Sequence, residues 1–172
     1  MNDLNEAVFL DRDGVINMER PNYVKTLDEL EIFPDVAESI KQLKRAGYLI
    51  VVITNQSAVN RGLINHDNIN NIHATIQKFL QESGTSVDAF YYCPHKPDEN
   101  CDCRKPKPGL LLKASKELKI DLSRSWMIGD NDTDIQAAQL AGCKAFKIGH
   151  DQRLDEVVES ILNSKNSSGS RR

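Results

Sequence analysis

The chain has 172 residues, of which 40% are hydrophobic and 27% are charged, and its formal net charge is −3. This composition is typical of a globular domain and excludes an intrinsically disordered chain. The length suits one domain, which we expect over residues 1–163, and the acidic balance gives no reason to expect nucleic acid as a partner.

Five short apolar segments alternate with amphipathic segments along the chain. The apolar segments predict strands that are buried on both faces, at 7–11, 48–54, 89–93, 125–129 and 144–149. Apolar residues at helical spacing, with glycines beyond several of the segment ends, predict helices at 34–47, 66–84, 108–120, 132–142 and 153–162. This order predicts an α/β fold, a doubly wound (Rossmann-like) parallel sheet with helices on both faces. The Ser-rich residues 164–172 are expected to form a disordered tail.

Two acidic loops follow strands of the predicted sheet. Asp11 and Asp13 come directly after the first strand, in DRDG, and Asp130 and Asp134 follow the fourth strand, in GDNDTD. Because the carboxyl ends of parallel strands meet at one edge of a sheet, these carboxylates should lie together. Neighbouring carboxylates repel one another, so a cation is expected among them, and oxygen ligands favour Mg²⁺. Taken alone, DRDG could also be a turn that caps a helix.

Groups that can hold a phosphate lie in two further loops. Thr54 and Asn55 end the second strand, where a hydroxyl and free backbone N–H groups can bind phosphate oxygens. Lys105 precedes the helix expected to begin at Pro108, and the N-terminus of a helix attracts anions. A solvated surface lysine is the alternative for Lys105. Because Mg²⁺ held by carboxylates usually accompanies a substrate phosphate, the sequence predicts a site for a phosphate ester.

The segments DRDG, VVITN, RKPKPG and IGDNDTD resemble, in this order, the four motifs of the haloacid dehalogenase superfamily of phosphatases. The resemblance extends from about residue 7 to residue 150. It implies that Asp11 is the nucleophile that forms an aspartyl-phosphate, and that Asp13 is the general acid and then the general base. It also implies that Thr54 binds the transferred phosphoryl group and that Lys105 offsets negative charge beside it.

The same resemblance implies a magnesium cofactor with a defined set of ligands. Asp11, Asp130 and the backbone carbonyl of Asp13 would bind Mg²⁺, and Asp134 would orient the site from behind these ligands. Two alternatives from other classes remain, a non-catalytic phosphoacceptor domain and a zinc-stabilised binding domain. The placement of Asp13 two residues after the nucleophile argues against the first.

Whether the cysteines form disulfides or bind a metal depends on the compartment in which the protein works. No apolar run approaches the roughly 18 residues of a membrane span, and the N-terminus lacks the pattern of a signal peptide. We therefore expect a cytoplasmic protein without membrane contact, and disulfides are rare in the cytoplasm.

The segment CPHKPDENCDC (93–103) contains Cys93, His95, Cys101 and Cys103, which form a closed set of ligands for a structural Zn²⁺. Incidental thiols are the alternative.

The segments that follow the first and third strands are too short for a separate cap domain. We therefore expect a capless enzyme whose site is open to solvent, so that specificity comes from short loops. Arg61 and Arg104 are candidates for binding a second anionic group of the substrate through charge-assisted hydrogen bonds. Arg61 could equally be a surface arginine.

The capless form, the cysteine loop and NQSAVNRG (55–62) resemble the histidinol-phosphatase-like subfamily within this superfamily. The resemblance implies a small phosphorylated sugar as the substrate, namely D-glycero-D-manno-heptose 1,7-bisphosphate, which would lose its 7-phosphate. Histidinol phosphate is the alternative substrate, since Asp98 and Glu99 could bind its cationic groups. We expect the chain to act as a monomer.

Overall fold

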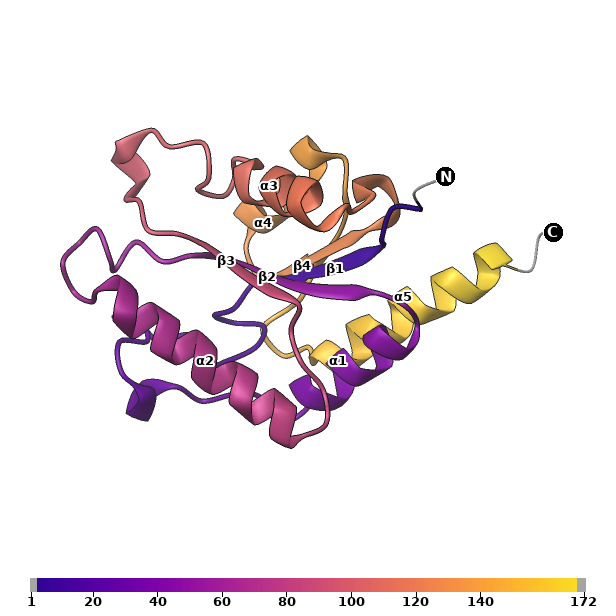
Figure 1. Ribbon diagram of the computed structural model, residues 1–172, viewed down its shortest axis with the longest axis horizontal. Coiled ribbons are helices and arrows are strands. Elements are labelled where there is room, and N and C mark those ends of the chain that lie inside the picture. Colours follow the sequence, from indigo (N-terminus) through magenta and orange to yellow (C-terminus); the bar gives the residue numbers. More distant parts are fainter. Residues whose placement is uncertain (1–2, 170–172) are drawn as a thin grey trace.

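Five parallel strands form one sheet in the order β3-β2-β1-β4-β5 in the computed structural model, which describes residues 3–169 (Figure 1). The strands are β1 (Ala7–Leu10), β2 (Leu49–Asn55), β3 (Ala89–Cys93), β4 (Trp126–Gly129) and β5 (Lys144–Lys147). The helices are α1 (Val36–Arg45), α2 (His66–Glu82), α3 (Gly109–Leu118), α4 (Asp132–Ala141) and α5 (Leu154–Gly169). The predicted α/β architecture and its parallel sheet are therefore confirmed.

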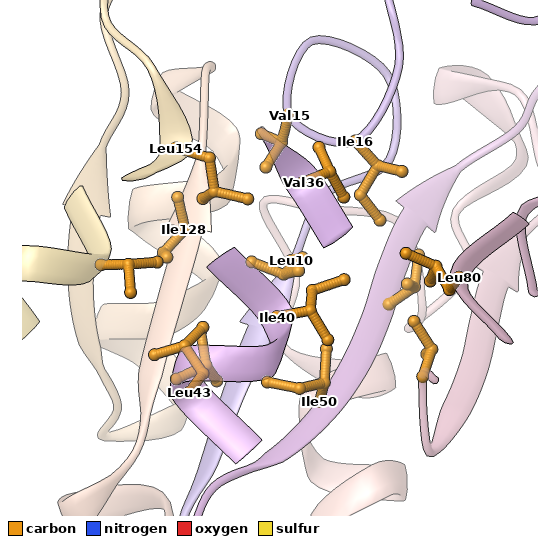
Figure 2. Packing of buried hydrophobic residues seen from close by; sticks show 14 of the residues in the cluster. Leu10, Val15, Ile16, Val36, Ile40, Leu43, Ile50, Leu80, Ile128 and Leu154 are labelled. Carbon is orange, nitrogen blue, oxygen red and sulfur yellow. The ribbon is translucent and has the colours of Figure 1, made fainter. Parts of the chain in front are cut away.

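Helices cover both faces of the sheet and enclose a separate core on each face. Helices α1, α2 and α5 lie on one face, and α3 and α4 lie on the other (Figure 1). Figure 2 shows the first core, where Ile40 of α1 lies beside Leu10 of β1 and Ile50 of β2. Because side chains alternate along a strand, Phe9 points into the second core, where it is fully buried with Leu111 of α3.

The two edge strands differ from the prediction that every strand is buried on both faces. Lys144 and Lys147 of β5 are exposed, and four of the five residues of β3 are only partly buried. The reason is their position at the two edges of the sheet, whereas the continuous apolar runs describe β1 and β2 correctly.

The last helix is longer than predicted. It was expected to end at residue 162, but α5 continues to Gly169, so the prediction of a disordered tail is wrong for residues 164–169. Lys165 explains the extension, because its Nζ atom donates to the carbonyl of Ala46 at 2.9 Å and lies 4.2 Å from the ring centre of Tyr48. These contacts stabilise the last turns of α5, although the Ser-rich composition of this segment is typical of a disordered one. Residues 170–172 lie outside the described part of the chain.

The connections around the carboxyl ends of the strands are short and carry no cap domain, as predicted. The segment between β1 and α1 contains one 3-10 turn, η1 (Leu27–Glu29), and the segment between β3 and α3 contains one, η2 (Pro97–Glu99). A third turn, η3 (Leu122–Arg124), precedes β4. Among the described helices, none has the length and apolar character needed to cross a membrane.

Candidate active site

Three carboxylates converge where the neighbouring strands β1 and β4 end. Asp11 follows β1, Asp130 follows β4, and Asp134 lies in the first turn of α4. One carboxylate oxygen from each residue lies within 4.8 Å of the others, and Asp11 and Asp134 are buried. The backbone N–H of Asp11 donates to the carbonyl of Ile128 at 3.0 Å and so continues the pairing of β1 with β4. The parallel sheet thus places the predicted acidic residues in one cluster.

Two glycines leave the space that these carboxylates occupy. Gly14 has a φ of +84°, and a Cβ atom added there would lie 2.2 Å from Oδ2 of Asp130. A Cβ atom added to Gly129 would lie 2.2 Å from Oδ2 of Asp134. The backbones of the two acidic loops therefore approach the carboxylates more closely than any other residue type would allow.

Lys105 supplies a positive charge inside this cluster. Its side chain is buried, and Nζ lies 3.0 Å from Oδ1 of Asp11 and 2.6 Å from Oδ1 of Asp134. Nζ also donates to the carbonyl of Ile53 at 2.9 Å. Burial alone would lower the pKa of Lys105, but the two carboxylates outweigh it and the pKa is raised. Lys105 is therefore a charged group of the site, and the alternative of a solvated surface lysine is wrong.

One lysine does not balance three carboxylates. Burial raises the pKa of Asp11 to about 7; Lys105 opposes this shift, while the charge of Asp134 adds to it. Burial and the charge of Asp134 also raise the pKa of Asp130. Burial and the neighbouring carboxylate thus make both groups costly to hold in the charged form; a divalent cation would offset that cost, and carboxylate oxygens are the ligands Mg²⁺ prefers. The residues present therefore fit a magnesium ion.

The carboxylate of Asp13 lies apart from this cluster and has other partners. Arg12, Asn17 and Gln56 all donate hydrogen bonds to it, and its side chain remains 22% exposed. Gln56 also donates to Oγ1 of Thr54 at 2.9 Å. This arrangement agrees with the expectation that Asp13 would meet a metal through its backbone carbonyl, since its side chain is engaged elsewhere.

A cavity of about 360 Å³ opens over these groups. It is lined by Asp11, Asp13, Glu19, Arg20, Pro21, Tyr23, Thr54, Asn55, Arg104, Lys105, Asn131, Thr133 and Asp134. Every predicted catalytic residue lines it, as do two of the three predicted substrate-binding residues, Asn55 and Arg104. Arg61 does not, because its side chain is exposed and donates from Nε to Oγ of Ser57 at 3.3 Å. The alternative of a surface arginine describes Arg61 better.

Several polar residues of this region were missing from the sequence-based site. Arg12, Asn17 and Gln56 are fully buried, and His73 of α2 is 6% exposed. Histidine on the apolar face of a predicted helix, four residues after Ile69 and three before Ile76, was the one available signal. Arg12, placed between two aspartates, resembled a solvated residue of a turn.

The four predicted zinc ligands also come together. The Sγ atom of Cys93 lies 3.6 Å from that of Cys101 and 3.1 Å from that of Cys103, and Nδ1 of His95 lies 3.4 Å from Cys93 and 3.2 Å from Cys103. Sulfur ligands around a tetrahedral zinc would be separated by about 3.8 Å. All four cysteines of the chain are free thiols. The donor set and its compact geometry therefore fit zinc.

The cysteine loop is connected to the cavity by Arg104. Its Nη1 atom donates to the carbonyl of His95 at 3.2 Å, and the next residue is Lys105. Although burial opposes the shift, hydrogen bonds from the backbone of Arg104 and Cys103 lower the pKa of Cys101 to about 7. A thiol of this kind ionises near neutral pH, whereas burial raises the pKa of Cys93 and Cys103, so a bound metal would have to favour their thiolates.

Comparison with known proteins gives consistent matches over most of the chain. The family model described as haloacid dehalogenase-like hydrolase matches residues 3–142. The D-glycero-β-D-manno-heptose-1,7-bisphosphate 7-phosphatase of Pseudomonas putida is 42% identical over 161 residues, which are 91% of this chain and 92% of that protein. The protein of the same name from Pseudomonas aeruginosa is 42% identical over 137 residues, 80% of this chain and 77% of that protein.

A solved structure shares both the fold and part of the sequence. The crystal structure of D,D-heptose 1,7-bisphosphate phosphatase from B. bronchiseptica, in complex with magnesium and phosphate, matches with a TM-score of 0.86 and 33% identity. The match covers 92% of this chain and 99% of that one. A second structure, of a putative haloacid dehalogenase-like phosphatase from Mesorhizobium loti, has a TM-score of 0.81 and 29% identity, and covers 95% of this chain and 87% of that one.

Proposed function

Because the chain belongs to the haloacid dehalogenase-like hydrolases, we propose that it is a Mg²⁺-dependent phosphomonoesterase that removes the 7-phosphate of D-glycero-D-manno-heptose 1,7-bisphosphate. The family expected from the motifs is thus confirmed. One observation carries the proposal: the cavity brings together a nucleophilic carboxylate, a buried lysine and a second carboxylate with free space beside it. Relatives that match this chain along most of their length bear the name of the same reaction.

The first step transfers the phosphoryl group to the protein. A carboxylate oxygen of Asp11 attacks the phosphorus at position 7, and the bond between phosphorus and the sugar oxygen breaks. Asp13 gives its proton to the departing oxygen, so the sugar leaves as an alcohol and Asp13 becomes a carboxylate. The product on the protein is an aspartyl-phosphate at Asp11.

The second step returns the protein to its starting state. Asp13 accepts a proton from a water molecule while the water oxygen attacks the phosphorus. The bond between phosphorus and Asp11 breaks, inorganic phosphate leaves, and Asp11 is again a carboxylate. One residue thus acts as acid and then as base, which fits its position at the exposed side of the cavity.

Other groups of the cavity stabilise charge on the phosphoryl oxygens. Lys105 neutralises repulsion between Asp11 and the phosphate, and the Thr54 hydroxyl, which accepts from Gln56, can donate its own hydrogen to a phosphoryl oxygen. Asp11, Asp130 and the backbone carbonyl of Asp13 would hold Mg²⁺, which when bound supplies positive charge against the phosphoryl oxygens. Asp134 holds Lys105 in place.

Such a combination is needed because unaided phosphate esters hydrolyse very slowly. Rate enhancements for this reaction reach ~10²¹, while general acid and base catalysis contributes about 10²–10⁴. The larger part must therefore come from the positioned nucleophile and from charges fixed around the phosphate.

The position of Arg104 supports a bisphosphate as the substrate. It lines the cavity, and the bond to His95 fixes its guanidinium at the rim. In an open site, affinity depends on a few polar anchors, and a second phosphate gives Arg104 a charged partner. Binding at this remote phosphate helps to position the one that reacts.

We also propose one structural zinc ion, held by Cys93, His95, Cys101 and Cys103. A site closed by four protein ligands leaves no position for a substrate, so zinc would fix the loop that carries Arg104. We further propose that the protein acts as a monomer in the cytoplasm, a compartment in which its four cysteines would remain free thiols.

Steady-state kinetics with two substrates test this proposal. We expect kcat/KM to be much higher for the heptose bisphosphate than for histidinol phosphate, and ³¹P NMR to identify heptose 1-phosphate as the product. Removal of Mg²⁺ should abolish both activities, and Asp11→Asn is the inactive control. A preference for histidinol phosphate would contradict the sugar assignment alone, while a lack of Mg²⁺-dependent hydrolysis of either ester would contradict the phosphatase.

A further inference from the structure

Arg12 is a fully buried arginine beside the proposed general acid. Its guanidinium makes three contacts with the Asp13 carboxylate, from Nε to Oδ1 at 3.2 Å and from Nη2 to Oδ1 at 3.0 Å and Oδ2 at 3.1 Å. Burying an arginine is costly unless its charge is paired and its donors are satisfied. The two side chains therefore hold each other in one orientation.

Two neutral side chains complete the enclosure of this carboxylate. Asn17 donates to Oδ1 of Asp13 at 2.9 Å and Gln56 donates to Oδ2 at 2.8 Å. Both oxygens thus accept from two residues on the protein side, while the carboxylate stays in contact with the cavity. A carboxylate with so many fixed donors has little rotational freedom, which suits a group that must meet one leaving oxygen.

The remaining end of the guanidinium faces His73 of α2. Nη1 of Arg12 lies 3.4 Å from Nε2 of His73, and no other hydrogen bond of Nη1 occurs within residues 3–169. The imidazole is held between two aromatic rings. Its centre lies 4.7 Å from the ring centre of Phe90, in a stacked contact, and 5.8 Å from the ring centre of Tyr92, in an edge contact. Burial and the charge of Arg12 lower the pKa of His73 to about 3, so the ring is neutral and can accept a hydrogen bond at Nε2.

We propose that His73 is a positioning residue, which acts through Arg12 to fix the Asp13 carboxylate for proton transfer to the leaving oxygen. The inference rests on the proposed phosphatase function. His73 lies on the otherwise aliphatic buried face of α2, between Ile69 and Ile76, and the polar group it brings there is the acceptor that faces Arg12. Without this acceptor, the buried Nη1 atom of Arg12 would have no hydrogen-bond partner. Because an unsatisfied buried donor is costly, the guanidinium would rotate away from Asp13 toward another acceptor.

The proposal predicts a dependence on the leaving group. A sugar alkoxide needs a proton as it departs, whereas 4-nitrophenolate leaves readily without one. Loss of alignment at Asp13 should therefore slow phosphoryl transfer from the sugar phosphate but not from 4-nitrophenyl phosphate. The comparison uses kcat/KM, because this constant reports the steps up to the departure of the leaving group.

The decisive variant is His73→Leu, which keeps the side-chain volume and removes the acceptor. We expect kcat/KM for the heptose bisphosphate to fall at least about tenfold, a part of the 10²–10⁴ available to a general acid, and kcat/KM for 4-nitrophenyl phosphate to fall less than about twofold. His73→Gln keeps an acceptor and should restore most of the loss. With Asp13→Asn already present, His73→Leu should have almost no further effect. Equal losses on both substrates, or an undiminished loss beside Asp13→Asn, would overturn the proposal.

A readout that needs no activity separates this inference from the proposed function. The Nε–H group of Arg12 is buried against Asp13, so its NMR signal should be resolved and slow to exchange in the wild type. We expect the signal to exchange faster in His73→Leu and to recover in His73→Gln. An unchanged signal would refute the link between His73 and Arg12. If the wild type hydrolyses neither ester, the proposed function fails and the proposed role of His73 in proton transfer fails with it, whatever the signal shows.

Discussion

Both polar atoms of the Asn55 side chain are bonded to the backbone of Lys105: Oδ1 accepts from its N–H at 3.1 Å, and Nδ2 donates to its carbonyl at 3.1 Å. The last residue of β2 thus fixes the loop that precedes α3, and this loop places Nζ of Lys105 between two carboxylates. The sequence predicted that Asn55 binds the substrate. Its side chain lines the cavity, but its bonds are those of a support for Lys105.

Asn55→Ala should therefore reduce both stability and turnover. Removing the side chain leaves two partly buried backbone groups without partners, so we expect the free energy of unfolding to fall by about 1–3 kcal/mol. Urea denaturation measures this loss. Asn60→Ala is the matched control, because Asn60 is exposed and, among residues 3–169, its side chain bonds only to Glu99 across the surface. Its effect should stay within about 0.5 kcal/mol, and equal effects for both variants would contradict the support role.

Asp11→Asn should remove turnover while leaving the fold intact. The amide keeps the shape of the carboxylate but is not a nucleophile, so we expect kcat to fall about 10³-fold or more. Circular dichroism and thermal unfolding check that the variant is folded. Retention of more than about a tenth of the wild-type kcat would show that another group attacks the phosphate.

Magnesium should stabilise the protein more at alkaline pH than at acidic pH. The pKa of Asp11 is raised to about 7 by burial, so without metal this group favours the fold below its unfolded pKa of about 3.9, and that contribution is lost as the pH rises through 7. Binding of Mg²⁺ needs the carboxylate, so affinity should rise roughly tenfold per pH unit up to about pH 7 and then level off.

Thermal unfolding with and without Mg²⁺ measures this effect. The rise in Tm at a fixed Mg²⁺ concentration should be larger at about pH 8 than at about pH 5.5. Asp11→Asn is the control, because its Mg²⁺-induced shift should be small and nearly independent of pH. An equal shift of the wild type at both pH values would argue against a buried, protonated Asp11 in the metal-free protein.

The two arginines that were predicted to bind a second phosphate should now behave differently. Arg104→Ala should raise KM for the heptose bisphosphate about tenfold or more, since a charge-assisted bond contributes roughly 1.5–3 kcal/mol, and should leave KM for a small monophosphate nearly unchanged. Arg61→Ala is the comparison, because Arg61 is exposed outside the cavity, and it should change neither constant by more than about twofold. Similar effects of the two variants would remove Arg104 from substrate recognition.

Elemental analysis should find one zinc ion per chain. Cys101→Ser should lower this content, whereas Cys143→Ala should retain it, because Cys143 packs in the core beside α4 and lies outside the cysteine cluster. The zinc-free domain should stay folded, since its two cores form on the faces of the sheet, but KM should rise as Arg104 loses its fixed position. A fully active protein without zinc would contradict this account.

The acidic residues of the site followed from the sequence because strand order alone brings their loops together. Asp11 and Asp130 come after β1 and β4, and a parallel sheet places the ends of these strands side by side. Arg12 could not be predicted in the same way, since its direction depends on the Asp13 carboxylate and on His73, which lies on a distant helix. A long-range contact also decides the end of α5, where Lys165 meets Ala46.

The close approach of Gly14 and Gly129 to the carboxylates limits which amino acids these two positions can accept. A methyl group at either position would occupy the space of an aspartate oxygen, and Gly14 also has a positive φ. In a library that samples every residue at each position, both sites should therefore accept glycine alone, although neither residue has a side chain to take part in chemistry. The acidic cluster thus depends on the two glycines, which leave the space free, as much as on the aspartates that fill it.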